Sequence, residues 1–174
     1  MKSTALRYGL LASAFVIVIG FFNCFVLAKN ADYKTAEIAG YLTIVLSMIF
    51  VFFGVRHYRD KVNNGQLSFG QGLKLGLLIA LIPAIFFGLF NVLYVEVIDP
   101  GWQDEYYSHY VENVKATASP AELPGKLNDL EKQKEFFSNP VMTFLVMTAT
   151  VFIIGAIVAI ISSLTLRKGK PALE

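Results

Sequence analysis

Four long apolar stretches alternate with polar segments along the chain, at residues 10–28, 38–55, 73–97 and 141–166. The hydrocarbon core of a bilayer is about 30 Å thick, and a helix that rises about 1.5 Å per residue needs roughly 20 apolar residues to cross it. Because lipid offers no partner for backbone amides and carbonyls, a segment that crosses it must pair these groups within a helix. The pattern therefore predicts an all-α, polytopic membrane protein with four transmembrane helices, built as a single membrane domain over residues 1–174.

The polar segment at 98–139 is also predicted to be helical, because a segment of this length is rarely without secondary structure. One helix is expected over 103–115 and a second from about Pro120 or Pro124 to Phe137. Each has a one-sided face with helical spacing, formed by Tyr106, Tyr107, Tyr110, Val111 and Val114 in the first and by Leu123, Leu127, Leu130, Lys134 and Phe137 in the second. These faces are expected to pair with each other, to lie on the bilayer surface or to bind a partner protein.

Short polar motifs mark the expected ends of several helices. Asn and Gly favour tight turns, and Ser or Asn before a helix favours capping of its first amides. The expected features are a turn at Asn63-Asn64-Gly65, an N-cap at Ser68, a capping box formed by Ser119 and Glu122, and an N-cap at Asn139 before Pro140. The third and fourth apolar stretches are therefore expected to begin shortly after Ser68 and Asn139.

Charged residues are few and unevenly distributed. Of the 174 residues 55% are hydrophobic and 16% are charged, against roughly 25% charged in a soluble domain. The N-terminus, the loop at 56–74 and the tail at 167–174 together hold nine Lys or Arg and two acidic residues, whereas the remaining segments hold six Lys or Arg and eleven acidic residues. Because basic loops stay in the cytoplasm, both termini and the loop at 56–74 are predicted to be cytoplasmic.

The first apolar stretch has an alternative interpretation as a secretory signal peptide. Lys2 and Arg7 precede it, and Val26-Leu27-Ala28 loosely resembles a cleavage site. The apolar run is about 19 residues long, longer than the 7–15 residues typical of a signal peptide. A retained transmembrane helix is therefore the main expectation.

The third apolar stretch carries small residues at every fourth position, which places them on one helical face. A face of this kind lets a neighbouring backbone approach closely in lipid, and its members are Gly72, Gly76, Ala80, Ala84 and Gly88. The face is expected to pack against another helix of the same chain or, alternatively, against a second copy. Pro83 beside it is expected to bend the helix.

Polar groups within the apolar stretches are uncharged. Asn23 and Asn91 are the most costly to leave facing lipid, so each is expected to bond to a neighbouring helix. The single cysteine, Cys24, excludes an intrachain disulfide and is expected to behave as a small apolar side chain. These residues predict contacts between helices rather than a substrate site.

The densest group of charged residues follows the second apolar stretch. Arg56, Tyr58, Arg59 and Lys61 are candidates for contact with anionic lipid headgroups, since each basic group near such a surface contributes about 1 kcal/mol. The alternative is ordinary anchoring by positive charge without a specific ligand.

Residues that could perform chemistry are scarce. The two histidines, His57 and His109, are expected on opposite sides of the membrane, and the pair Glu105 and His109 supplies too few ligands for a metal site. The sequence predicts no catalytic residue, no cofactor, no metal and no nucleic-acid partner.

Several motifs resemble those of a known family. The runs Phe52–Lys61 and Ser68–Gly76, with Gly65 between them, look like the signature of the bacterial domain-of-unknown-function family 4199, as do Ile98-Asp99-Pro100 and Asn139-Pro140. The similarity covers nearly the whole chain. It implies a four-helix protein of the bacterial cytoplasmic (inner) membrane, without an assigned activity and without catalytic residues to transfer.

Three functions are compatible with these features. The first is a non-enzymatic structural, accessory or interaction protein, with membrane lipid and a second copy or an unidentified membrane protein as partners. The second is a small carrier or channel formed by an oligomer, which requires Asn23, Thr43, Ser47 and Asn91 to converge on one face. The third is an enzyme acting on lipid headgroups near Glu96 and Asp99. The absence of catalytic motifs favours the first.

Overall fold

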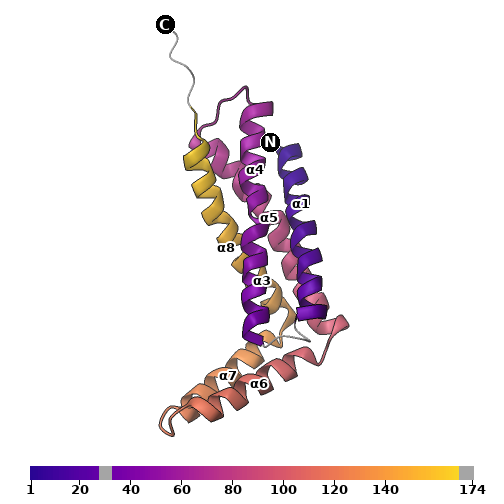
Figure 1. Ribbon diagram of the computed structural model, residues 1–174, viewed down its shortest axis with the longest axis vertical. Coiled ribbons are helices and arrows are strands. Elements are labelled where there is room, and N and C mark those ends of the chain that lie inside the picture. Colours follow the sequence, from indigo (N-terminus) through magenta and orange to yellow (C-terminus); the bar gives the residue numbers. More distant parts are fainter. Residues whose placement is uncertain (28–32, 169–174) are drawn as a thin grey trace. The chain divides into compact units, whose positions relative to one another are not determined.

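The computed structural model of the protein describes residues 1–27 and 33–168, and these are helical throughout apart from short connections (Figure 1). The α-helices are α1 (Lys2–Phe22), α3 (Tyr33–Ser47), α4 (Ile49–His57), α5 (Phe69–Leu93), α6 (Trp102–Thr117), α7 (Leu123–Phe137) and α8 (Pro140–Leu166). Three π-helical segments extend some of them, namely η1 (Asn23–Leu27), η2 (Tyr58–Val62) and η3 (Tyr94–Ile98). The predicted all-α class is confirmed over the described residues.

Four continuous helical segments are long and apolar enough to cross a membrane: Lys2–Phe25, Tyr33–Val62, Phe69–Ile98 and Pro140–Leu166. The second, third and fourth segments contain the predicted stretches, whereas the first begins before residue 10 and ends at Phe25, short of the predicted residue 28. The chain therefore has the architecture of a multi-pass membrane protein. The proposed cleavage site at Val26-Leu27-Ala28 lies partly outside the described residues, since residues 28–32 are not described.

The described residues fall into two compact units, one formed by residues 1–87 with 148–168 and the other by residues 88–147. In the first unit α1 packs against α3 and α4, and the fully buried side chains come from one face of each helix, among them Val16, Met48, Val51, Val55, Leu75, Ile79 and Val151. Whether the chain acts as a single membrane domain stays a prediction.

The outside of the first unit is strongly apolar. Large aliphatic and aromatic side chains are about half exposed there, including Val18, Leu42, Val45, Phe53, Ile153, Ile157 and Leu164. Buried in the same unit are the polar side chains of Ser13, Thr43, Ser47, Ser162 and Ser163. A surface of this kind promotes aggregation in water, whereas in lipid it carries no free-energy penalty. In lipid, small or weakly polar residues concentrate between the helices instead.

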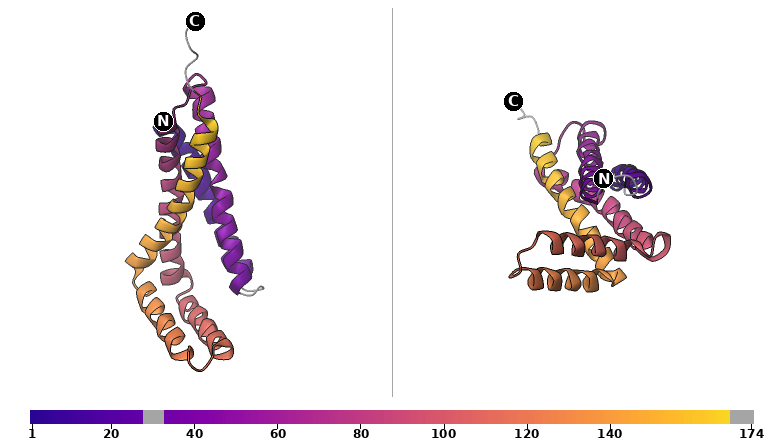
Figure 2. Two further views of the ribbon diagram at one scale, coloured as in Figure 1. Left: turned by 90° about the vertical axis from the view of Figure 1, so that its left-hand side faces the viewer. Right: turned by 60° about the horizontal axis from the view of Figure 1, so that its bottom comes forward.

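The second unit is centred on α6 and α7, which lie side by side (Figure 2). Lys134 Nζ lies 2.6 Å from Asp104 Oδ1, and Gln103 Nε2 donates to the carbonyl oxygen of Phe137 at 2.7 Å. Tyr107 is buried at the contact. Both helices occur where their periodicity predicted them, and their apolar faces pack against each other.

The expected helix caps are present at two of three places. At the start of α5, Ser68 Oγ accepts from the amide of Gln71 at 3.2 Å, while Gln71 Oε1 accepts from the amide of Ser68 at 3.0 Å, so the two form a capping box. Asn139 Oδ1 accepts from the amide of Val141 at 2.9 Å at the start of α8.

The capping box predicted at Ser119 and Glu122 is wrong. The Ser119 hydroxyl donates to the Glu122 carboxylate at 3.1 Å instead of accepting from a backbone amide. α7 begins only at Leu123, with Pro124 in its first turn. Proline needs no hydrogen-bond acceptor at that position, and Ser119 supports the start of α7 through its carbonyl oxygen, which accepts from the amide of Leu123 at 3.0 Å.

Candidate functional site

The small residues of α5 lie in close contact with α8 in the first unit. A Cβ atom added to Gly76 would lie 2.6 Å from Cβ and 3.1 Å from Cα of Ala159 in α8. A Cβ added to Gly72 would lie 2.8 Å from Oγ of Ser163. These distances leave no room for a larger residue, so the backbones of α5 and α8 are in near contact.

The partner surface on α8 has its own row of small residues, which the sequence analysis did not identify. A Cβ added to Gly155 would lie 2.5 Å from Cβ of Ala80. Ala159 and Ser163 follow Gly155 at four-residue intervals, and both are fully buried. The same spacing rule that drew attention to α5 applies here, so the signal was present in the sequence. We call the contact between these two rows the α5–α8 seam.

The other members of the predicted row are also buried. Ala80 and Ala84 are fully buried in the first unit, and Gly88 is buried in the second. α5 continues through Pro83 as one helix. Gly72, Gly76 and Ala80 of this row thus pack against α8 of the same chain, and for Ala84 and Gly88 the packing partner stays a prediction.

α5 is in contact with three other helices of the first unit, as Figure 1 allows the reader to follow. Besides the seam with α8, its Ile82 side chain fills the space beside Gly9 of α1. Its Ile79 side chain lies 2.5 Å from a Cβ added to Gly54 of α4. Glycines on the neighbouring helices therefore accept large α5 side chains, whereas the seam uses small residues on both sides.

Several polar residues of the membrane-spanning helices have hydrogen-bond partners, whereas the buried hydroxyls of Thr148 and Ser162 have none. Asn23 Nδ2 donates to Thr43 Oγ1 at 3.3 Å, and the Thr43 hydroxyl donates to the carbonyl of Ala39 at 2.8 Å. The Ser47 hydroxyl donates to the carbonyl of Ile44 within its own helix. Asn91 is half-buried and belongs to the second unit. Asn23 and Thr43 thus come together, while the hydroxyl of Ser47 is used within α3.

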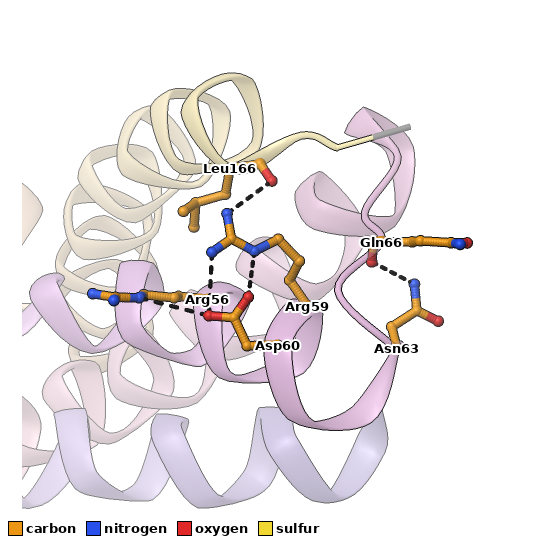
Figure 3. A network of polar contacts seen from close by, with 6 residues as sticks. All are labelled: Arg56, Arg59, Asp60, Asn63, Gln66 and Leu166. Carbon is orange, nitrogen blue, oxygen red and sulfur yellow. Dashed lines mark hydrogen bonds and ion pairs between the residues drawn. The ribbon is translucent and has the colours of Figure 1, made fainter. Parts of the chain in front are cut away.

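A second polar arrangement, which we call the end cluster, lies where α4 and η2 meet the end of α8 (Figure 3). Its members are Arg56, Arg59, Asp60, Asn63, Gln66 and the backbone of Leu166. Arg59 donates twice to the Asp60 carboxylate, from Nε at 2.6 Å and from Nη2 at 3.1 Å. Arg56 Nε lies 3.7 Å from the same carboxylate. The third nitrogen of Arg59, Nη1, donates to the carbonyl of Leu166 at 3.4 Å, which gives a partner to one of the carbonyls that end α8.

The loop after η2 is held by a tight turn and a short antiparallel bridge. Asn64 and Gly65 have φ angles of 52° and 78°, and the amide of Gln66 donates to the carbonyl of Asn63 at 3.0 Å. Positive φ at both central residues is typical of the turns that Asn-Gly sequences form. Leu67 and Lys168 then exchange two backbone hydrogen bonds of 2.9 Å. The loop and the residues after α8 are therefore joined at several points.

The structure changes the prediction of anionic-lipid contact for two of its four residues. Tyr58 is 8% exposed and belongs to the hydrophobic core, so its ring is not available to headgroups. This burial argues against lipid contact at Tyr58, whose core cluster includes Leu67 of the loop and Leu166 of α8. Arg59 is occupied by Asp60 and Leu166. Arg56 and Lys61 are exposed, and for them lipid contact stays a prediction.

Titratable groups of the second unit are arranged as isolated pairs. The Lys126 ammonium, 3.3 Å away, and the Ser119 hydroxyl hold the pKa of the Glu122 carboxyl below its ordinary value. Burial raises the pKa of the Tyr107 phenol. Tyr94 donates to the Asp99 carboxylate at 3.3 Å, and Glu96 is exposed. Among residues 1–27 and 33–168, no three His, Cys, Asp or Glu side chains gather in a way that could hold a metal ion.

Comparison with known proteins gives one result for this chain. No curated protein and no solved structure matches it significantly. The family model described as "Protein of unknown function (DUF4199)" matches residues 7–168, which include most of the first membrane-spanning helix, the other three in full, the α5–α8 seam and the end cluster. The chain therefore belongs to the DUF4199 family of membrane proteins of unknown function.

Proposed function

We propose that this protein is a non-enzymatic structural, accessory or interaction protein of the bacterial cytoplasmic membrane, and that its partners are membrane lipid and a second copy or another membrane protein. The α5–α8 seam is the observation that carries the proposal. Gly72, Gly76 and Gly155 are in contact with the neighbouring helix at distances that leave no room for even one added carbon. A seam of this kind holds the helices in a fixed arrangement. A fixed arrangement suits a protein that acts by presenting its surface to lipid or to a partner protein.

The polar residues of the first unit argue for packing rather than for transport. A carrier needs polar groups that face a water-filled path, because ions and solutes must replace their hydration shells there. The hydroxyls of Thr43 and Ser47 donate to backbone carbonyls of their own helix, and the Asn23 amide donates to the Thr43 hydroxyl. The bond from Asn23 to Thr43 joins two helical segments, and a bond of this kind contributes about 0.6 kcal/mol on average.

The proposed orientation places both termini and the loop after η2 on the cytoplasmic side. Tyr8 of α1 lies beside His57, their ring centroids being 5.7 Å apart. Arg59 and Leu67 bond to the end of α8. The start of the chain, the basic loop and the end of α8 thus gather at one end of the first unit, as Figure 1 also shows. Basic residues at a common end are those that the positive-inside rule keeps in the cytoplasm.

The role is tested by photocrosslinking in the native membrane. A photoreactive amino acid is placed at Ile157, on the exposed side of α8, or at Val111 in α6, and the adducts are identified by mass spectrometry. We expect discrete protein adducts that Thr43→Val leaves unchanged. Solute flux through proteoliposomes that Thr43→Val abolishes, together with adducts to lipid only, would overturn the proposal in favour of a carrier formed by an oligomer.

The orientation is tested separately by labelling from one side of the membrane. In a Cys24→Ser background, a cysteine is placed at position 57 or at position 110, and an impermeant thiol reagent is added to intact cells. We expect labelling at position 110 and protection at position 57. Equal labelling of both positions contradicts the proposed orientation.

A further inference from the structure

A groove on the first unit lies beside α1, α4 and η2, near the end cluster. Its walls combine three aromatic rings with four ionisable side chains, and its lining residues are Tyr8, Phe50, Phe53, Arg56, His57, Asp60 and Lys61. The family to which the chain belongs assigns no ligand to it, and the proposed function names membrane lipid as a partner without a defined binding position. In this groove an apolar wall meets several basic groups.

The aromatic part of the groove comes from the membrane-spanning region of α4. Phe53 is 43% exposed, although it lies among apolar residues. Phe50 lies one turn before it along α4, and Tyr8 of α1 closes the side toward His57 with a ring separation of 5.7 Å. Exposed aromatic rings in this position provide a surface that an acyl chain can cover.

The basic part of the groove follows within two turns of the same helical segment. Arg56 is about 9 Å along the helix axis from Phe50, at about 1.5 Å per residue, and Lys61 lies further along in η2. A ligand that spans this distance must carry an apolar portion at one end and an anionic group at the other.

The charges at the mouth of the groove favour an anion. Asp60 is the acidic residue among those that line it, and its carboxylate is already bound by two nitrogens of Arg59. The Arg56 side chain is 56% exposed, and its contact with Asp60 is long, at 3.7 Å. The guanidinium of Arg56 and the ammonium of Lys61 therefore keep donors available, and a guanidinium suits the paired oxygens of a phosphate.

We propose that this groove binds one anionic phospholipid, with its headgroup phosphate at Arg56 and Lys61 and an acyl chain along Phe50 and Phe53. His57 lies between these two parts and contacts the glycerol region. The inference depends on membrane insertion but not on the non-enzymatic role or on a protein partner, so the two proposals fail separately. It differs from general attraction of basic loops to acidic membranes because it requires one defined position and both parts of the groove.

The test is native mass spectrometry of the full-length protein in detergent, titrated with phosphatidylglycerol or phosphatidylcholine. We expect a single retained phosphatidylglycerol and weaker retention of phosphatidylcholine. Arg56→Gln with Lys61→Gln is expected to weaken phosphatidylglycerol binding about fivefold for each basic group removed. Phe53→Ala is expected to weaken it further, and inorganic phosphate alone is not expected to bind measurably.

The matched control removes two basic groups elsewhere on the same unit, by Lys2→Gln with Arg167→Gln, both of which are exposed and outside the groove. This control is expected to leave binding within about twofold. Equal losses in the control and in the groove variant, or equal binding of both lipids, overturn the proposal. Binding of inorganic phosphate that competes with phosphatidylglycerol overturns the lipid as the occupant.

A second measurement does not depend on the variants being folded. The unmodified protein is reconstituted with a phosphatidylglycerol that carries a photoreactive acyl chain, and the crosslinked peptide is identified. The proposal expects adducts concentrated between residues 50 and 61 and at Tyr8. Adducts spread evenly over the exposed side chains of α1, α3 and α8 contradict it.

Discussion

The two compact units of this protein are built from the same kind of helix and yet bury different things. The first unit buries small residues at the α5–α8 seam together with a core of large apolar side chains such as Met48, Leu75 and Ile79. In the second, α7 has no fully buried side chain, and the contact between α6 and α7 depends on half-buried leucines together with one buried tyrosine. The comparison shows that close backbone contact at the α5–α8 seam contributes to the stability of the first unit. In the second unit, α6 and α7 are joined by side-chain contacts that are only partly buried.

The largest effect is expected when the α5–α8 seam is filled. In Gly76→Leu the new side chain collides with the backbone of Ala159, and we expect a loss of about 3 kcal/mol in the free energy of unfolding. Thermal or denaturant unfolding in detergent measures it. Gly40→Leu is the matched control, since an added Cβ there meets no atom within 4 Å, and it is expected to change stability by less than about 0.5 kcal/mol. Similar losses in both variants would show that the seam is not the tightest contact.

A smaller effect is expected from truncating the contact between α6 and α7. Leu130 is half-buried beside Tyr107 and Val111, so Leu130→Ala should cost about 1 kcal/mol, less than a fully buried leucine would. Because Trp102 is the single tryptophan and lies in this unit, its fluorescence follows the loss. Phe136→Ala, at a position that is 48% exposed, serves as the control. A larger loss from Leu130→Ala than from Gly76→Leu would reverse the comparison.

The end cluster is expected to contribute locally rather than to the whole fold. Arg59→Ala removes the bidentate contact with Asp60 and the donor to Leu166, so the amides of Leu67 and Lys168 should exchange with solvent about two- to fivefold faster. Hydrogen exchange monitored by mass spectrometry measures this. Arg56→Ala, which removes only a long and exposed contact, is expected to leave those amides unchanged. Unchanged exchange in Arg59→Ala would mean that the bridge alone holds the loop.

The smallest effect concerns pH and the first turn of α7. Because Lys126 and Ser119 lower the pKa of Glu122 in the folded protein, the carboxylate stabilises this turn at neutral pH, and the contribution disappears as the pH falls through that lowered pKa. Titration of the Glu122 side chain by NMR measures the pKa directly. Lys126→Gln is expected to bring the pKa back toward its ordinary value. A titration that Lys126→Gln does not change would contradict the assigned cause.

The membrane-spanning helices were predictable because the bilayer alone sets how long and how apolar a crossing helix must be. Their ends were less predictable, since α4 continues through η2 to Val62 and α5 through η3 to Ile98. The caps at Ser68 and Asn139 were predictable because they involve neighbours two or three residues away. The same spacing rule did not predict the bonds of the Ser119 side chain, because a proline in the next turn moves the start of α7 to Leu123.

Contacts between distant segments were not predictable from the pattern. The row on α5 was recognised, but its partner row of Gly155, Ala159 and Ser163 was overlooked, because three small residues in an apolar helix are common. Arg59 bonds to Leu166, which is far away in the sequence, and Tyr58 is covered by the same arrangement. The spacing of residues along a helix predicts which face is suited to contact, whereas the three-dimensional structure is needed to identify the segment that the face contacts.

The seam also has a consequence for how the protein is made. α8 leaves the ribosome after α5, and it supplies one whole side of the seam. Until it arrives, the inserted precursor presents the bare main chain of α5 at Gly72 and Gly76 to the acyl chains. Assembly in the bilayer is thus completed only after synthesis has passed Ser163, and a nascent chain that stops earlier displays a strip by which membrane quality control can recognise it.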